Sequence, residues 1–85
     1  MSNPKELTEE RNKQHGDWSM QSQLAHDLKE TMRLGGYWSK LSAGQQEALD
    51  MIQTKVSRIL VGDPTKEDHW DDIAGYAFLG SGRSK

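Results

Sequence analysis

The chain has 85 residues, and its 11 basic and 13 acidic residues give a formal net charge of −2 at pH 7. This balance argues against generic affinity for nucleic acid, which requires a basic stripe, so we expect no nucleic-acid partner. Without cysteine, the chain can form neither a disulfide nor a thiolate metal site. It contains no apolar run of about 18 residues and no apolar stretch near its start, so we expect neither a membrane span nor a signal peptide.

Only 33% of the residues are hydrophobic, which limits the core that so short a chain can build. Domains of this size bury a small share of their surface and are marginally stable alone. We therefore expect a homo-oligomer that buries further apolar surface between copies.

Four segments have helical patterns, and none resembles a strand. The first, from about Pro4 to Lys13, is polar and offers only Leu7 for burial. We expect residues 1–16 to form a loosely attached arm. The second runs from about Trp18 to Leu34, after Asp17 as a cap, with an apolar stripe at helical spacing. The stripe consists of Leu24, Leu28 and Met32, flanked by Gln21 and Ala25.

The third segment, about Ala43 to Val61, carries the clearest helix signals. Ser42 and Gln45 have the spacing of a capping box, and Gly62 and Pro64 mark the end. At 100° per residue, its apolar side chains fall within about 120° of one another, which predicts the central helix of the domain. They are Ala48, Leu49, Ile52, Val56, Ile59 and Leu60.

The fourth segment begins after Thr65, a suitable N-cap residue, with Asp68 at the third helical position. We expect its buried face to consist of Trp70, Ile73, Ala74 and Ala77, and residues 80–85 to form a flexible tail. The predicted fold is therefore all-α: a small bundle of three main helices over residues 17–79, preceded by a short N-terminal helical arm.

Lys55 and Arg58 are the first candidates for ligand binding, because side chains three residues apart on a helix can face one anion. Arginine supplies a planar fork of donors and lysine a point charge, a combination suited to phosphate. The alternative is a solvated flank of the helix, since such basic pairs are common.

Asp68 and Asp72 are an i,i+4 pair that could hold Mg²⁺ through carboxylate oxygens. Gly75 continues their face without a side chain and leaves room for a ligand. Two other interpretations stay open. Acidic residues near a helix start are favoured by the macrodipole, and Lys55 or Arg58 could pair with Asp68 or Asp72 across antiparallel helices.

His69 and Tyr76 lie between the acidic and apolar faces of the fourth helix, and we interpret His69 as a boundary residue. The three histidines have no metal-ligand spacing. The chain also lacks a P-loop, a nucleophile elbow and an aromatic-basic platform for single strands, which disfavours an ordinary NTPase, a serine hydrolase and a nucleic-acid reader.

The order "HGDW … ALDMIQTKVSRILVGD … DHWDDIAGYA" resembles a family of small tailed-phage proteins with a closing D-x-x-x-D-I-x-G-Y-A motif. It is also similar to a domain of a phage nucleotide kinase without a P-loop and to phage domains associated with nucleotide modification. The resemblance covers about residues 11–79 and implies phage origin, a helical fold and work on nucleotides. It marks His15, Gly16, Asp17, Asp50, Lys55, Arg58, Asp68, Asp72, Gly75 and Tyr76.

Three functional hypotheses follow for a protein of the host cytoplasm. In the first, the chain binds a nucleotide or phosphorylated metabolite, as a weak phosphotransferase or a sequestering protein; Lys55 and Arg58 hold phosphates, and Trp18 or Tyr76 stacks on a base. In the second, it inhibits a host enzyme or defence complex through a patch at Tyr37, Trp38 or the acidic face. In the third, it is a structural accessory. The sequence leaves catalysis undecided.

Overall fold

The computed structural model describes the backbone of residues 3–15 and 17–83, and the side chains of residues 3–10 and 17–83. Within these ranges the chain is all-helical, as predicted, with three long helices after a shorter one. No helix there is long and apolar enough to cross a membrane. The elements are α1 (Pro4–His15), α2 (Trp18–Met32), the 3₁₀ turn η1 (Trp38–Lys40), α3 (Ala43–Val61) and α4 (Glu67–Ser81).

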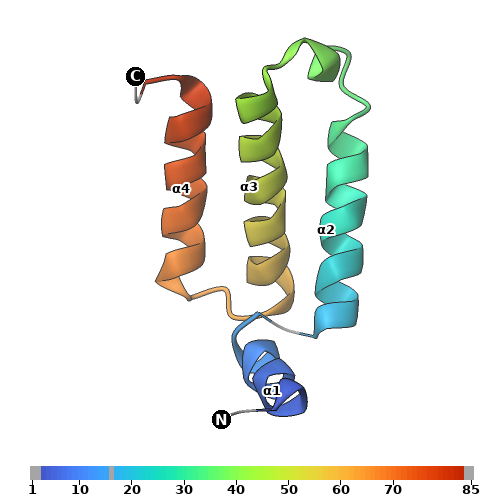
Figure 1. The fold of residues 1–85 in the computed structure, drawn as a ribbon, viewed down its shortest axis with the longest axis vertical. Coiled ribbons are helices and arrows are strands. Elements are labelled where there is room, and N and C mark those ends of the chain that lie inside the picture. The colour runs from blue at the N-terminus through green and yellow to red at the C-terminus, as the bar shows by residue number, and fades with distance from the viewer. Residues whose placement is uncertain (1–2, 16, 84–85) are drawn as a thin grey trace.

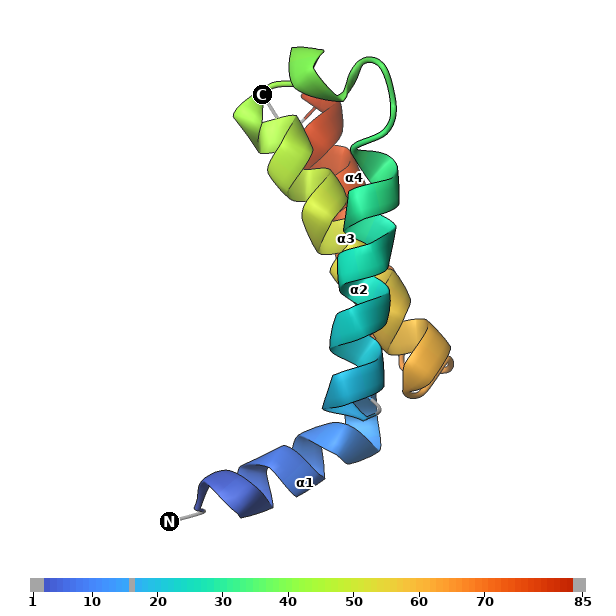
Figure 2. The same ribbon diagram turned by 90° about the vertical axis from the view of Figure 1, so that its right-hand side faces the viewer.

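The three long helices form a row in which α3 lies between α2 and α4 (Figure 1). Seen from the side, the row is one helix thick, and α1 projects from its lower end (Figure 2). The expected bundle is therefore an open layer. Among the described residues, the buried apolar side chains are only Ala25, Ala48 and Ile59.

The starts of α2 and α3 confirm the predicted caps. The Asp17 carboxylate accepts a hydrogen bond from the Met20 N–H at 3.2 Å. Ser42 Oγ accepts from the Gln45 N–H at 3.1 Å, and Gln45 Oε1 accepts from the Ser42 N–H at 3.0 Å. Both arrangements satisfy amide groups that a helix N-terminus leaves without partners, and α3 has the bounds that the sequence predicted.

The start of α4 differs from the prediction, because its N-cap residue is Lys66 and not Thr65. Asp63 Oδ1 accepts hydrogen bonds from the Thr65 N–H at 2.9 Å and from Thr65 Oγ1 at 2.6 Å. These bonds lower the pKa of the Asp63 carboxyl, and they commit Thr65 to the turn before the helix. Asp68 is consequently the second helical residue and not the third.

The α3-facing side of α4 also differs from the expected apolar stripe. Trp70, Ala74 and Ala77 are exposed, whereas His69 is buried and Tyr76 is half-buried. The helix lies close to α3 at Gly80, where an added Cβ would lie 3.1 Å from the Ala48 Cβ. The main neighbour of α4 is α3, and the side of α4 that faces it carries His69, Tyr76 and Gly80 and not the most apolar stripe. The helix continues to Ser81, two residues beyond its expected end.

The contact between α2 and α3 is polar at its centre. Gln21 Nε2 donates to Ser57 Oγ at 3.0 Å, and Ser57 Oγ donates to the Thr54 carbonyl at 2.6 Å. Gln21 and Ser57 are both buried. Farther along, Arg33 Nη2 forms an ion pair with Asp50 Oδ2 at 2.9 Å. Asp50 thus points toward α2 and away from Lys55, as its position on the helical wheel predicts.

Two glycines of α4 provide a test of this packing. A Cβ at Gly75 would meet nothing within 4 Å, so Gly75→Ala should raise the free energy of unfolding by about 1 kcal/mol through helix propensity. Gly80→Ala should gain clearly less, because its Cβ would press on Ala48. Thermal unfolding of both variants checks this, since 1 kcal/mol shifts Tm by about 4–8 °C in a domain of this size. Equal gains would contradict the close approach of α3 and α4.

Candidate functional site

Charged side chains gather where the end of α3 faces the start of α4. Lys55 and Arg58 come from α3, Lys66 precedes α4, and His69 and Asp72 come from its first two turns. The three basic groups all act electrostatically on His69. We call these five residues the basic cluster.

The pair Lys55–Asp72 links the two helices. Lys55 Nζ lies 2.9 Å from Asp72 Oδ2, and the lysine side chain is only 12% exposed while the aspartate is 45% exposed. The hydrogen bond from Lys55, more than its charge, holds the pKa of the Asp72 carboxyl below its ordinary value. One of the cross-helix pairings anticipated from the sequence, Lys55 with Asp72, is therefore present.

His69 is the buried member of the basic cluster, with 2% of its surface exposed. Burial lowers the pKa of its imidazole, and the charges of Lys55, Arg58 and Lys66 lower it further, whereas Asp72 acts in the opposite direction. Low dielectric and like charge both disfavour the imidazolium. His69 is thus a neutral polar group between basic side chains, and its interpretation as a boundary residue is wrong.

The basic cluster contains more basic than acidic groups, and the exposed carboxylates Asp63 and Asp68 lie at its border. The basic cluster combines three basic side chains with one carboxylate, although the chain carries −2 overall. Asp68 approaches Lys66 at 3.9 Å, but its side chain is 78% exposed and the interaction is screened by solvent. The geometry therefore favours an anion at this end of the α3–α4 interface.

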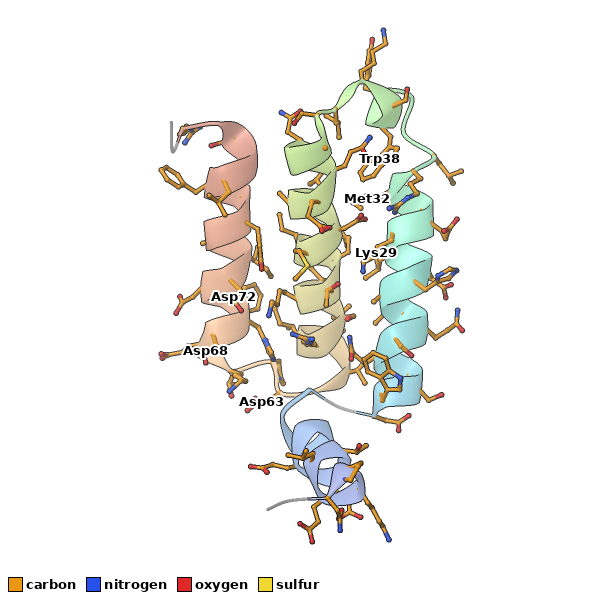
Figure 3. The ribbon with its side chains drawn as sticks, in the orientation of Figure 1. Lys29, Met32, Trp38, Asp63, Asp68 and Asp72 are labelled. Carbon is orange, nitrogen blue, oxygen red and sulfur yellow. The ribbon has the colours of Figure 1, made fainter. Side chains whose placement is uncertain are left out.

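The predicted metal ligands Asp68 and Asp72 follow one another along the start of α4 (Figure 3). Asp72 is engaged by Lys55. The described part of the chain has no group of three or more acidic or histidine side chains placed to hold a metal ion. These two carboxylates could contribute to Mg²⁺ binding only beside ligands from elsewhere, such as phosphate oxygens.

The remaining candidate residues lie apart from the basic cluster or at its border. Asp17 is exposed and caps α2 at the far side of the row. Gly75 faces open space. Tyr76 is half-buried two turns after His69, about 10 Å along the helix axis, and it lines cavities of about 520 and 270 Å³. The side chain of His15 and all of Gly16 lie outside the described residues.

Sequence reasoning missed Lys66 and the inward position of His69. The signal that could have found them is spacing: His69, Tyr76 and Gly80 repeat at seven and four residues and so share one helix face. That face contains one polar group, one aromatic residue and one glycine, and hydrophobicity alone ranks it below the stripe of Trp70, Ile73 and Ala77.

The fold and the basic cluster define a small all-helical protein with a positively charged junction between two helices. The model of a family described as a domain of unknown function (DUF6378) matches residues 2–83, nearly the whole chain. The chain therefore belongs to this family. No curated protein and no solved structure matches it.

The buried His69 predicts acid sensitivity. Because the pKa of His69 is lower in the folded state than in the unfolded chain, the unfolded state binds more protons below about pH 6.5, the ordinary histidine value. The free energy of unfolding should therefore fall as the pH drops from 6.5 toward the lower folded pKa. One proton limits the slope to about 1.4 kcal/mol per pH unit.

Thermal or urea unfolding between pH 7.5 and pH 5 measures this slope, and His69→Gln should flatten it. The matched control is His26→Gln, on the exposed face of α2, which should retain the wild-type slope. A wild-type slope in His69→Gln would contradict the assignment. The Asp72 carboxyl titrates in a separate, more acidic range, because its pKa is lowered in the folded state. Its ionised form stabilises the fold above about pH 3.8, the ordinary aspartate value, and this stabilisation is lost as the pH falls toward the lower folded pKa.

Proposed function

We propose that the chain binds a nucleotide or another phosphorylated metabolite through the basic cluster. The observation that carries this proposal is the meeting of Lys55, Arg58 and Lys66 at one junction, where Asp72 pairs with Lys55 and the exposed Asp68 approaches Lys66. A locally positive site on a negatively charged chain selects anions at that place and not over the surface in general.

The side chains supply complementary parts of phosphate recognition. Arg58 offers a planar fork of N–H donors, and Lys55 and Lys66 offer compact charges. Lys55 is held by Asp72 at 2.9 Å, so an entering phosphate takes over a position that the carboxylate occupies. Buried and half-buried donors bind an anion more strongly than exposed ones, because less water screens them.

The position of Tyr76 favours a nucleotide over inorganic phosphate as the ligand. Tyr76 lies about 10 Å along α4 from His69, a distance that a nucleotide can bridge, and it borders the 520 Å³ cavity beside Ala48 and Leu79. An aromatic ring there can stack on a base. Asp68 and Asp72 would contribute to Mg²⁺ bound with the phosphates, since protein-bound Mg²⁺ is commonly shared between one or two carboxylates and substrate phosphates.

The resemblance to phage nucleotide proteins points to the same ligand class, and with it to a host-cell setting. It includes a domain of a nucleotide kinase and domains associated with nucleotide modification, and both weak phosphoryl transfer and sequestration of a nucleotide are compatible with the basic cluster. Phosphoryl transfer demands chiefly positioning and charge neutralisation. His15 and Asp17 remain candidate contacts through the resemblance alone.

A second candidate function, binding of a host protein, is favoured by the loop between α2 and α3. Leu34 and Tyr37 are 83% and 75% exposed there. Two aromatic rings of this loop are covered by cations. Arg33 Cζ lies 4.7 Å from the centroid of the Trp38 ring, and Lys40 Nζ lies 5.4 Å from the centroid of the Tyr37 ring. Exposed aromatic residues are typical anchors of protein interfaces.

Thermal shift against nucleoside mono-, di- and triphosphates tests the first function. A ligand at 100 times its Kd should raise the free energy of unfolding by about 2.7 kcal/mol, and Lys55→Ala should abolish this shift. Each variant is compared with its own ligand-free Tm, since Lys55→Ala also removes the pair with Asp72. Lys40→Ala, at the opposite end of the row, is the charge-matched control and should keep the shift.

If no nucleotide changes the Tm of the wild-type chain, nucleotide binding is excluded and the second candidate function, binding of a host protein, is favoured. A host-lysate pull-down that depends on Tyr37 would then identify that function, whereas a shift retained in Lys55→Ala would place the ligand elsewhere.

Asp72→Asn separates the two roles of Asp72. Without Mg²⁺, the variant should bind phosphate ligands more tightly than wild type, because Lys55 loses its carboxylate partner. If Asp72 also shares Mg²⁺, the added affinity that the wild-type chain gains from Mg²⁺ should shrink in the variant. Titration calorimetry with and without Mg²⁺ measures both effects, and Asp71→Asn, an exposed neighbour, is the control.

A further inference from the structure

The row of helices has two different sides, which the positions on α3 define. Ala48 and Lys55 of α3 face α4, and Ser57 faces α2. At 100° per residue, the two remaining sides of α3 lie a quarter-turn from these contacts. One carries Glu47, Thr54 and Arg58. The other carries Leu49, Ile52, Val56 and Leu60.

The apolar side of α3 continues onto both neighbouring helices. The same helical-wheel argument, applied to α2, places Met20 and Leu24 on this side of the row. Applied to α4, it places Trp70, Ile73 and Ala77 there. An independent observation agrees for α4: one cavity of about 270 Å³ is lined by Leu49, Ile52 and Ala77 together. The cavity on the opposite side contains Glu47 and Leu79 instead. We call the side containing Leu49, Ile52, Val56 and Leu60 the apolar face.

This face is incompletely covered by the chain itself. Leu49, Ile52 and Val56 are half-buried, and Leu60 is 65% exposed. Met20 and Trp70 are 64% and 55% exposed. Part of the helix stripe that the sequence marks as the core is therefore incompletely covered in the open row, and exposed apolar patches of several hundred Å² are uncommon on monomers.

The dimensions of the molecule indicate how much surface is left open. Its accessible surface is 6149 Å², whereas a compact monomer of 9.6 kDa exposes about 5,100 Å². Its radius of gyration is 14.5 Å, against about 12 Å for a compact domain of this length. The projecting α1 contributes to both excesses, and the open face of the row contributes as well.

The outline of the row leaves room for an interface of standard size. The row is 27 Å wide, and α3, with 19 residues, is about 28 Å long. The product, about 750 Å², is the outline of one whole side of the row, and it is comparable to the roughly 800 Å² that each partner contributes to a standard interface.

The composition of the face indicates the occupant. Its central side chains carry no charge, and charged residues such as Asp27 lie at its margin. An uncharged apolar surface is complementary to itself under a two-fold axis, and apolar cores are typical of homodimer interfaces. We propose that a second copy of the chain covers the apolar face and forms a two-layer dimer of helix rows.

In this dimer, the face with Glu47, Arg58 and Asp72 remains on the outside of each row. The dimer is thus compatible with the proposed ligand site but does not depend on it. The open row acquires a closed core, which a single copy does not provide.

Sedimentation equilibrium or light scattering of the purified chain tests the proposal. We expect twice the monomer mass of 9.6 kDa, and we expect Leu60→Glu and Met20→Glu to reduce it to the monomer mass. Both residues are more than half exposed in one copy, so neither change should prevent folding of a single chain. Circular dichroism checks the helix content of each variant.

The matched control is Leu79→Glu. Leu79 is 58% exposed and lines the cavity on the opposite side of the row, so this variant should stay dimeric. A monomeric wild-type chain would overturn the proposal; Leu60-dependent binding of an apolar dye would then assign the face to another occupant. A dimer that dissociates in Leu79→Glu but not in Leu60→Glu would equally overturn it.

Discussion

The position of α3 between two partners of different chemistry determines the rest of the structure. Toward α2 it presents Ser57, which is buried against Gln21 through a 3.0 Å hydrogen bond. Toward α4 it presents Ala48, which admits Gly80 at close range. Separating the buried Gln21–Ser57 pair would leave polar groups without partners, which is costly. The close contact of Ala48 with Gly80 depends on both residues being small, and it limits how α4 can shift along α3. These contacts fix both neighbours relative to α3, and therefore also bring Lys55 and Arg58 toward His69.

Local signals predicted most of the helices because their causes are local. Asp17 and the Ser42–Gln45 box act on amides within three residues, and their helices begin as expected. Thr65 failed as a cap because Asp63 competes for it through hydrogen bonds within the turn. Such competition depends on turn geometry, which residue preferences alone do not encode.

The charged site was predictable in part, for a different reason. Spacing placed Lys55 and Arg58 together and made Asp72 a possible partner, because these relations need only helix geometry. The inward position of His69 depends on how α4 is rotated about its own axis. Hydrophobicity predicted the wrong rotation, since it assumed that the most apolar stripe packs within the chain. The exposed Trp70 and Ala77 of α4 show that this assumption fails for a row one helix thick.

The Lys55–Asp72 pair has a consequence for selectivity, if the basic cluster binds phosphate. Asp72 is tethered 2.9 Å from Lys55, and a tethered group acts at a high effective concentration that dissolved ions rarely reach. Chloride or a simple carboxylate gains little by exchanging with it, because each brings one negative charge. A phosphate dianion brings more charge and more acceptor oxygens. The ion pair would thus act as an internal threshold that discriminates against monovalent anions.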